Sequence, residues 1–214
     1  MASIYEFKPR FQAALRPVLN WLARGGATPN MITGAAIIGS MVAGTGLLFA
    51  RERSPLLLIL PVWLLARMAL NALDGMLARE HHMTTPLGAA LNELGDVMSD
   101  LAIYLPLAIL FDEVRWPVIA FSIGAVLTEF SGLLGQVLGG MRRYDGPMGK
   151  SDRALLAGTL GLVTFFVPQA RTIWPWAFGL GAVLALWTCW NRVRRALIEL
   201  GTKSVARPSD GGDE

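Results

Sequence analysis

Six stretches of this chain are apolar over lengths that suit helices crossing a lipid bilayer. Three carry no charge and cover residues 31–50, 154–170 and 172–191. Three more are apolar apart from a few charged side chains and cover residues 55–78, 86–111 and 116–139. A helix needs about 20 apolar residues to cross the hydrocarbon core, where every backbone polar group must be bonded internally. The sequence therefore predicts an all-α integral membrane protein with six transmembrane helices.

The distribution of lysine and arginine predicts how these helices are oriented. Of the 19 basic residues, fourteen fall on one side of a six-span arrangement and four on the other, with Arg67 inside a span. Short cytoplasmic loops collect Lys and Arg, so both termini are expected in the cytoplasm and the protein in the inner membrane of a bacterium. The high isoelectric point of 9.4 then reflects charge at the membrane surface. No nucleic-acid partner is expected, because no nucleic-acid-binding motif is present.

Residues 1–27 are expected to form an amphipathic helix at the membrane interface. Apolar residues recur every three or four positions at Ile4, Phe7, Phe11, Leu15, Val18 and Leu22. Pro9 and Pro17 should break or bend this helix, and an irregular basic leader is the alternative. A signal peptide is not expected, since charges occur throughout the segment. Residues 28–200 would form the membrane domain, and residues 201–214 a polar, disordered tail.

Acidic side chains stand out on the second and third predicted spans. Four polar or small residues of the second span share one helical face: Asn71, Asp74, Gly75 and Ala78. On the third span a second face is formed at steps of four residues by Gly88, Asn92, Asp96 and Asp100. Ionised carboxylates inside a bilayer are costly and are therefore functional by default. The alternative is a structural polar seam that Arg67 and water neutralise.

Oxygen-bearing side chains on two neighbouring helices suit a hard divalent cation such as Mg²⁺. Small residues beside them, Gly75, Ala78 and Gly88, would let a ligand approach the backbone, although they also permit close helix packing. The two predicted faces therefore indicate a cation-dependent site within the membrane.

The spacing of these residues resembles the motif of the CDP-alcohol phosphatidyltransferase family. That motif reads Asp-x2-Asp-Gly-x2-Ala-Arg, eight residues, then Gly-x3-Asp-x3-Asp. The corresponding residues here are Asn71, Asp74, Gly75, Ala78, Arg79, Gly88, Asn92 and Asp96. Every spacing and six of the eight residue types match. Thr28-Pro29-Asn30 and Gly149-Lys150 also resemble family features.

The resemblance implies a role for each matched residue. Asp74 and Asp96 would be catalytic, the first as a metal ligand and the second also as the base for the acceptor hydroxyl. Asn71 and Asn92 stand where the family has aspartate, and the nearest substitute ligands are Asp100 and Glu93, neither of which belongs to the family motif. The cofactor would be Mg²⁺ or Mn²⁺, as one ion or two. The CDP group would contact Gly75, Ala78, Arg79, Gly88 and Asn30.

Four basic residues near the cytoplasmic side are expected to hold anionic groups of the lipid or of the acceptor. They are Arg142, Arg143, Lys150 and Arg153. The alternative is that they only anchor the helices at the membrane surface.

The implied reaction transfers a substituted phosphate from a CDP-alcohol such as CDP-diacylglycerol to an acceptor hydroxyl, with release of CMP, in phospholipid biosynthesis. The partners would be a CDP-linked lipid, a small or lipid alcohol and membrane lipids, and a homodimer is compatible with the sequence. Asn71 and Asn92 leave open a second hypothesis, a degenerate family member that binds a nucleotide-lipid or regulates a partner without turnover. A third is an ion or proton transporter, which would not need Gly75 and Gly88 at fixed spacing.

Overall fold

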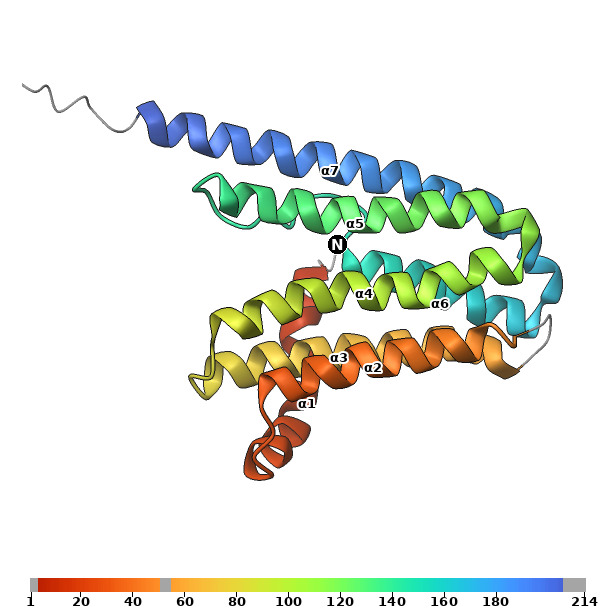
Figure 1. Ribbon diagram of the computed structural model, residues 1–214, viewed down its shortest axis with the longest axis horizontal. Helices are drawn as coiled ribbons and strands as arrows, with labels where there is room; N and C mark the ends of the chain where they lie inside the picture. Colours follow the sequence, from red (N-terminus) through yellow and green to blue (C-terminus); the bar gives the residue numbers. More distant parts are fainter. Residues whose placement is uncertain (1–3, 51–54, 206–214) are drawn as a thin grey trace, which may run out of the picture.

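The structure is a computed structural model that describes residues 4–50 and 55–205, and every regular element within these ranges is helical (Figure 1). The α-helices are α1 (Ile4–Arg24), α2 (Pro29–Leu47), α3 (Ile59–Glu80), α4 (Pro86–Leu110), α5 (Arg115–Val137), α6 (Lys150–Phe166) and α7 (Trp174–Val205). Short 3-10 helices precede α3, α5 and α7, at Pro55–Leu58, Asp112–Val114 and Pro168–Ile173. The prediction of an all-helical chain is therefore correct for the described residues.

The starts of α2 and α4 follow directly from the sequence. The Thr28 hydroxyl accepts a hydrogen bond from the Met31 backbone N–H at 3.3 Å, and Pro29 occupies the first helical turn. Thr85 caps α4 in the same way, accepting from the Gly88 N–H at 3.0 Å. A threonine cap followed by proline is a favourable helix start, because the cap satisfies a free N–H and proline lacks one.

Four of the helical segments are long and apolar enough to cross a membrane: Pro29–Leu47, Pro55–Glu80, Asp112–Val137 and Pro168–Thr202. The other two predicted spans also form helices, but α4 carries three acidic residues and α6 is only 17 residues long. In the bundle, α5 lies along α7, α2 packs on α4 and α3 packs on α6 (Figure 1). Thus α4 packs against the apolar helices α2 and α5, and α6 packs against the apolar α3.

An aromatic cluster holds α4, α5 and α7 together beyond the acidic part of α4. Tyr104, Phe121 and Phe178 are fully buried, and their rings meet edge to face with centroids 5.1 and 5.2 Å apart. Trp174 extends the cluster, 5.8 Å from Phe178, and donates its indole N–H to Thr164 at 2.9 Å. Edge-to-face pairs add to the burial of aromatic surface, so this end of the bundle is well packed.

Glycine sets the distance between α2 and α4. A Cβ at Gly44 would collide with the backbone carbonyl of Ala102, whereas one at Gly34 would meet no atom within 4 Å. The two backbones therefore touch at Gly44, as small residues allow in membrane helices. This contact fixes α4, which carries the acidic residues.

At the N-terminus, α1 is one helix that Pro9 and Pro17 do not break. Among its residues whose burial is described, Leu19 is buried against Ile32 and Leu77, and Leu15 and Leu22 of the predicted apolar face pack beside it, whereas Val18 of that face is 43% exposed. The helix α7 runs to Val205, so the predicted tail at 201–214 begins within it, and residues 206–214 lie outside the described residues.

Candidate functional site

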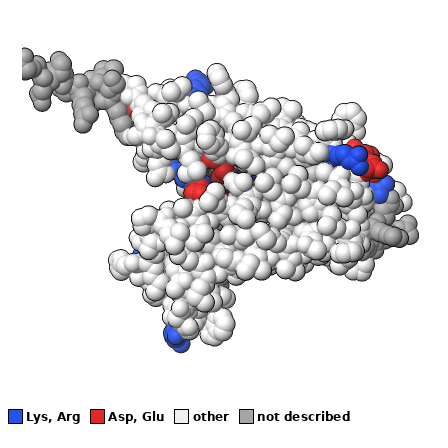
Figure 2. Space-filling view, viewed as in Figure 1, with Lys and Arg blue, Asp and Glu red and all other residues white. Residues whose placement is uncertain are grey.

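The motif residues of α3 and α4 meet inside the bundle. Asn71 on α3 donates a side-chain N–H to Oδ1 of Asp96 on α4 at 3.2 Å. Asp74, one turn further along α3, and Asp96 are only 5% and 4% exposed. The space-filling view shows acidic side chains gathered in a notch on an otherwise largely uncharged face (Figure 2). The sequence therefore predicted correctly that two polar helix faces lie together.

Asp74 has a polar but uncharged partner. Its Oδ2 accepts a hydrogen bond from the Thr33 hydroxyl of α2 at 3.0 Å. Among the described residues, no lysine or arginine forms an ion pair with this carboxylate. Thr33 also donates to the backbone carbonyl of Pro29 at 3.1 Å, which fixes the hydroxyl at the start of α2. Asp74 is thus oriented by a neutral donor rather than by an ion pair.

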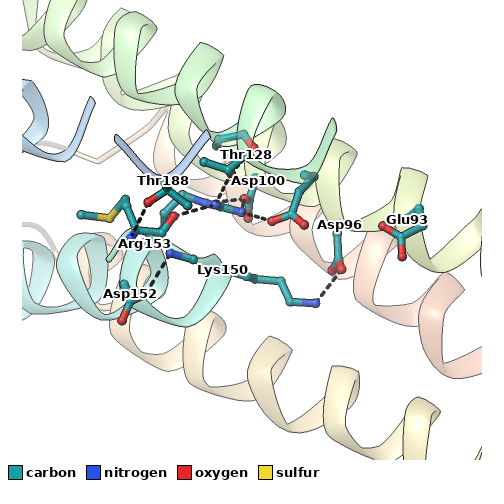
Figure 3. Close-up of polar contacts among 12 residues, drawn as sticks. Glu93, Asp96, Asp100, Thr128, Lys150, Asp152, Arg153 and Thr188 are labelled. Atoms are coloured by element: carbon teal, nitrogen blue, oxygen red, sulfur yellow. Dashed lines mark hydrogen bonds and ion pairs between the residues drawn. The ribbon is translucent and has the colours of Figure 1, made fainter. Parts of the chain in front are cut away.

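Asp96 is surrounded by donors. The ammonium nitrogen of Lys150 on α6 lies 2.5 Å from its Oδ2 (Figure 3). The guanidinium of Arg67 on α3 donates to the backbone carbonyl of Asp96 at 2.9 Å and lies 3.5 Å from Oδ1. Together with Asn71, these groups hold the carboxylate in one orientation.

Asp100, one turn beyond Asp96, is enclosed by two arginines. Arg67 pairs with its Oδ1, and Arg153 on α6 donates to its Oδ2 at 2.8 and 3.0 Å (Figure 3). Both oxygens are engaged, and the residue is 1% exposed. The geometry does not support the expected role of Asp100 as a substitute metal ligand, because two cations already neutralise it.

Ion pairs between arginines and acidic residues continue across α5 and the loop that follows it. Arg153 also donates to Glu129 at 2.7 Å, and Arg142 pairs with both Glu129 and Glu93. We call the six residues Arg67, Asp100, Arg153, Glu129, Arg142 and Glu93 the buried charge network, in which the first four are buried and the last two are half-buried. Positive and negative members alternate along it and are equal in number. The network joins α3, α4, α5 and α6.

Two of the four predicted phosphate-binding residues, Arg142 and Arg153, belong to this network. Arg153 is fully buried and also donates to the hydroxyl of Thr128 at 2.7 Å, so it does not reach the membrane surface as expected. Sequence reasoning named only Arg67 as a cation that could neutralise the acidic residues. It missed that α6 begins at Lys150, which places residues 150 and 153 three positions apart on one helix facing α4.

Of the other two predicted phosphate-binding residues, Arg143 lies in the loop between α5 and α6, and Lys150 is the first residue of α6. Arg143 pairs with Asp145 at 3.1 Å and with Glu199 of α7 at 3.2 Å, and Arg195 also pairs with Asp145. Arg142 to Asp145 line a hollow in which Arg142 lies 5.0 Å from the ring centre of Tyr144. Of the predicted four, Arg142, Arg143 and Lys150 are half-buried, and Arg153 is buried.

The predicted CDP-binding residues form two close pairs. A Cβ at Gly88 would lie 2.8 Å from Oδ1 of Asn30, and one at Gly75 would lie 3.1 Å from a guanidinium nitrogen of Arg79. Glycine therefore makes room for the Asn30 amide and the Arg79 head group, and Arg79 is exposed. Ala78 lies between Gly75 and Arg79 and is half-buried.

The donor chemistry of the site suits a hard cation, although its charge is low. Within the described residues, no three Asp, Glu, His or Cys side chains form a group suited to a metal ion. Two carboxylates, Asp74 and Asp96, lie with the amide of Asn71, and Asn92 is one turn before Asp96 on α4. All four carry oxygen atoms of the kind that Mg²⁺ and Mn²⁺ prefer.

A structural comparison supports the fold. The Mycobacterium tuberculosis phosphatidylinositol phosphate synthase PgsA1 with CDP-DAG bound superimposes with a TM-score of 0.68 at 23% identity, covering 84% of this chain and 92% of that chain. Its structure with manganese and citrate gives the same TM-score over 85% of this chain and 88% of that one. The two proteins share a fold.

Sequence comparison gives the family. The chain is 47% identical over 197 residues to the inner membrane protein YnbA of Escherichia coli K12, which covers 92% of this chain and 97% of YnbA. It is also 32% identical over 95 residues to an uncharacterised protein of Aquifex aeolicus, over 44% of this chain and 46% of that protein. Residues 27–190 match the profile named CDP-alcohol phosphatidyltransferase. This chain therefore belongs to the CDP-alcohol phosphatidyltransferase family.

Proposed function

We propose that this protein transfers the phosphatidyl group of a CDP-linked lipid, with CDP-diacylglycerol as the donor, to an acceptor hydroxyl and releases CMP. The observation that carries the proposal is that Asp74 and Asp96, at the family spacing, lie in one polar site between α3 and α4. The similarity to a synthase with CDP-DAG bound supports the choice of donor.

The chain's own residues supply distinct parts of this chemistry. Asp96, fixed by Asn71 and Lys150, is the base that accepts the proton of the acceptor hydroxyl. Asp74, fixed by Thr33, would hold a divalent cation, with Asn71 and Asn92 offering amide oxygens. When bound, that cation supplies positive charge for the pyrophosphate and the departing CMP. The structure of PgsA1 with manganese supports this assignment.

The remaining residues bind the donor and the acceptor. Gly75, Ala78 and Gly88 leave space for the CDP group beside Asn30 and Arg79. Arg143 and Lys150, which are half-buried, would contact anionic groups of the acceptor or lipid.

The proposal includes a placement in the membrane. All of α2 to α7 would cross the inner membrane of a bacterium, with both termini in the cytoplasm and α1 lying at the interface. The buried charge network supports the crossing of α4 and α6, because its members neutralise one another inside the bundle. The site would then open at the cytoplasmic ends of α3 and α4.

The test is release of CMP by the purified protein in lipid nanodiscs. Labelled CDP-diacylglycerol is supplied with Mg²⁺ and a panel of polyols, amino alcohols and their phosphates. We expect CMP to appear together with one lipid product when the correct acceptor is present. Asp74→Asn serves as the inactive control.

A second candidate function is a non-catalytic family member that binds the nucleotide-lipid. Asn71, Asn92 and the Lys150–Asp96 ion pair favour it, because they reduce the negative charge available for cations. Saturable binding of CDP-diacylglycerol without CMP release from any alcohol would favour this candidate over transfer. The family assignment supports both candidates over ion or proton transport.

A further inference from the structure

Charged side chains inside the bundle differ in whether they have a partner of opposite sign. The buried charge network contains three arginines and three acids, each in contact with a partner of opposite sign. It therefore needs no ion from solution. Between α3 and α4, Asp96 pairs with Lys150 and also lies 3.5 Å from Arg67 of the network. Asp74 is in no ion pair among the described residues, and Arg79 of the motif is exposed at the end of α3.

We propose that the ammonium group of Lys150 takes the place of a divalent cation beside Asp96, so that this site binds a single divalent cation, at Asp74. The inference deepens the proposed function and rests on it for the presence of a cation. It assigns to Lys150 a role beyond contact with a substrate phosphate.

The first argument is the geometry at Asp96. Its Oδ2 faces the Lys150 nitrogen at 2.5 Å, and its Oδ1 accepts from the Asn71 amide at 3.2 Å, with Arg67 3.5 Å away. A metal ion binds oxygen lone pairs and is repelled by nearby positive groups. Both oxygens of Asp96 already face donors, and two of those donors are cations.

The second argument is the residue at position 71. Two carboxylates about 3 Å apart cannot both stay ionised without a cation or a shared proton between them. The amide of Asn71 instead donates to Asp96, which removes the need for a bridging ion at this position. Asn71 and Lys150 therefore both reduce the need for a divalent cation beside Asp96.

The third argument is that Lys150 is held by a rigid element. It is the first residue of α6, where the Asp152 carboxylate accepts from the Gly149 N–H at 2.9 Å. One turn further, Arg153 anchors α6 to Asp100. The ammonium group thus approaches Asp96 from a fixed backbone (Figure 3). Asp74 contrasts with Asp96, because its side-chain donor is the neutral Thr33 hydroxyl.

The test counts Mn²⁺ ions on the protein by electron paramagnetic resonance, in nanodiscs of neutral lipid and without nucleotide. We expect about one bound Mn²⁺ per chain in the wild type. Asn71→Asp with Asn92→Asp should still bind about one ion while Lys150 is present. Adding Lys150→Met to that pair should raise the count to about two, and Lys150→Arg should hold it at one.

Arg115→Gln in the same double variant is the matched control for lost positive charge, because Arg115 pairs only with Asp112 at an exposed loop among the described residues. It should leave the count at one. Two ions on the wild type, none on the wild type, or two ions on the double variant with Lys150 intact would each overturn the inference. Melting curves confirm that each counted variant is folded.

The outcomes also distinguish this inference from the proposed function. One bound Mn²⁺ without CMP release would retain the role of Lys150 and reject transfer. CMP release with two bound ions would retain transfer and reject the role of Lys150.

Discussion

The hydroxyl of Thr33 on α2 donates to Oδ2 of Asp74 on α3 over 3.0 Å, and it is the side-chain hydrogen bond that orients this buried carboxylate. A hydroxyl orients the carboxylate without cancelling its charge, unlike the lysine beside Asp96. The two acidic residues of the motif therefore have different electrostatic surroundings, and we expect them to serve different roles.

Asp74→Asn and Asp96→Asn should each reduce CMP release by at least about 100-fold, because one removes the negative charge for a cation and the other removes the base. Thr33→Val should reduce the rate of CMP release about tenfold, since the Asp74 carboxylate remains but is no longer oriented. Rates with CDP-diacylglycerol and the identified acceptor provide the measurement. Full activity of the Asp96 variant would exclude this residue as the base.

Asp100→Asn should act mainly on stability. It leaves Arg67 and Arg153 without their shared partner in the bundle, and loss of one member of a buried ion pair costs about 3–5 kcal/mol. Asp112→Asn is the matched control, because its pair with Arg115 is exposed and should contribute less than about 1 kcal/mol. Unfolding in mixed micelles measures both. Unchanged stability together with a higher Mg²⁺ requirement would instead make Asp100 a metal ligand.

Converting Asn71 and Asn92 together to Asp should lower the Mg²⁺ concentration at half-maximal activity. Each carboxylate adds a full negative charge near the ion, so affinity rises even if altered geometry slows turnover. A metal titration of the CMP-release rate measures the shift. An unchanged midpoint would mean that neither side chain faces the cation.

The topology follows from the asymmetry of basic residues. A reporter enzyme that is active only outside the cytoplasm should be inactive when fused to the C-terminus and active when fused after Asp112, in the loop between α4 and α5. The measurement compares the reporter activities of the two fusions at equal expression levels. Two fusions with the same activity would contradict the six-span arrangement.

Helix packing offers a test that is independent of function. Gly44→Ala would force the α2 backbone away from Ala102 and should destabilise the bundle by about 1–3 kcal/mol. Gly34→Ala on the same helix meets no atom within 4 Å and should not destabilise it. Equal melting temperatures for the two variants would show that α2 and α4 do not touch at Gly44.

Much of the fold could be predicted because its determinants are local. Thr28 and Thr85 mark helix starts by the chemistry of their caps, and the apolar runs predict where helices lie. The faces of Asn71 and Asp96 could also be paired, because their helices follow one another in the chain. Local patterns do not reveal that Leu19, which lies off the predicted apolar face of α1, is buried, although Leu15 and Leu22 of that face pack beside it.

The partners of the acidic residues could not be predicted, since they come from distant segments. Asp100 and Arg153 are 53 residues apart in sequence, and only the packing of α6 against α3 brings them together. In the sequence, Arg153 near the predicted cytoplasmic side cannot be distinguished from an arginine that anchors a helix at the membrane surface until the start of α6 is known. Arg142 likewise reaches Glu129 by a turn of the loop after α5.

The buried charge network also bears on how the chain enters the membrane during synthesis. Arg67 and Asp100 emerge from the ribosome well before Arg153. The helices α3 and α4 therefore reach the bilayer before Arg153, one of the two arginines that pair with Asp100, has been synthesised. Neither helix should leave the insertion machinery alone, because unpaired charges in lipid are costly. Insertion of α3 to α6 should instead occur as one late, cooperative event, and a nascent chain that ends before α6 should remain accessible to quality-control proteases.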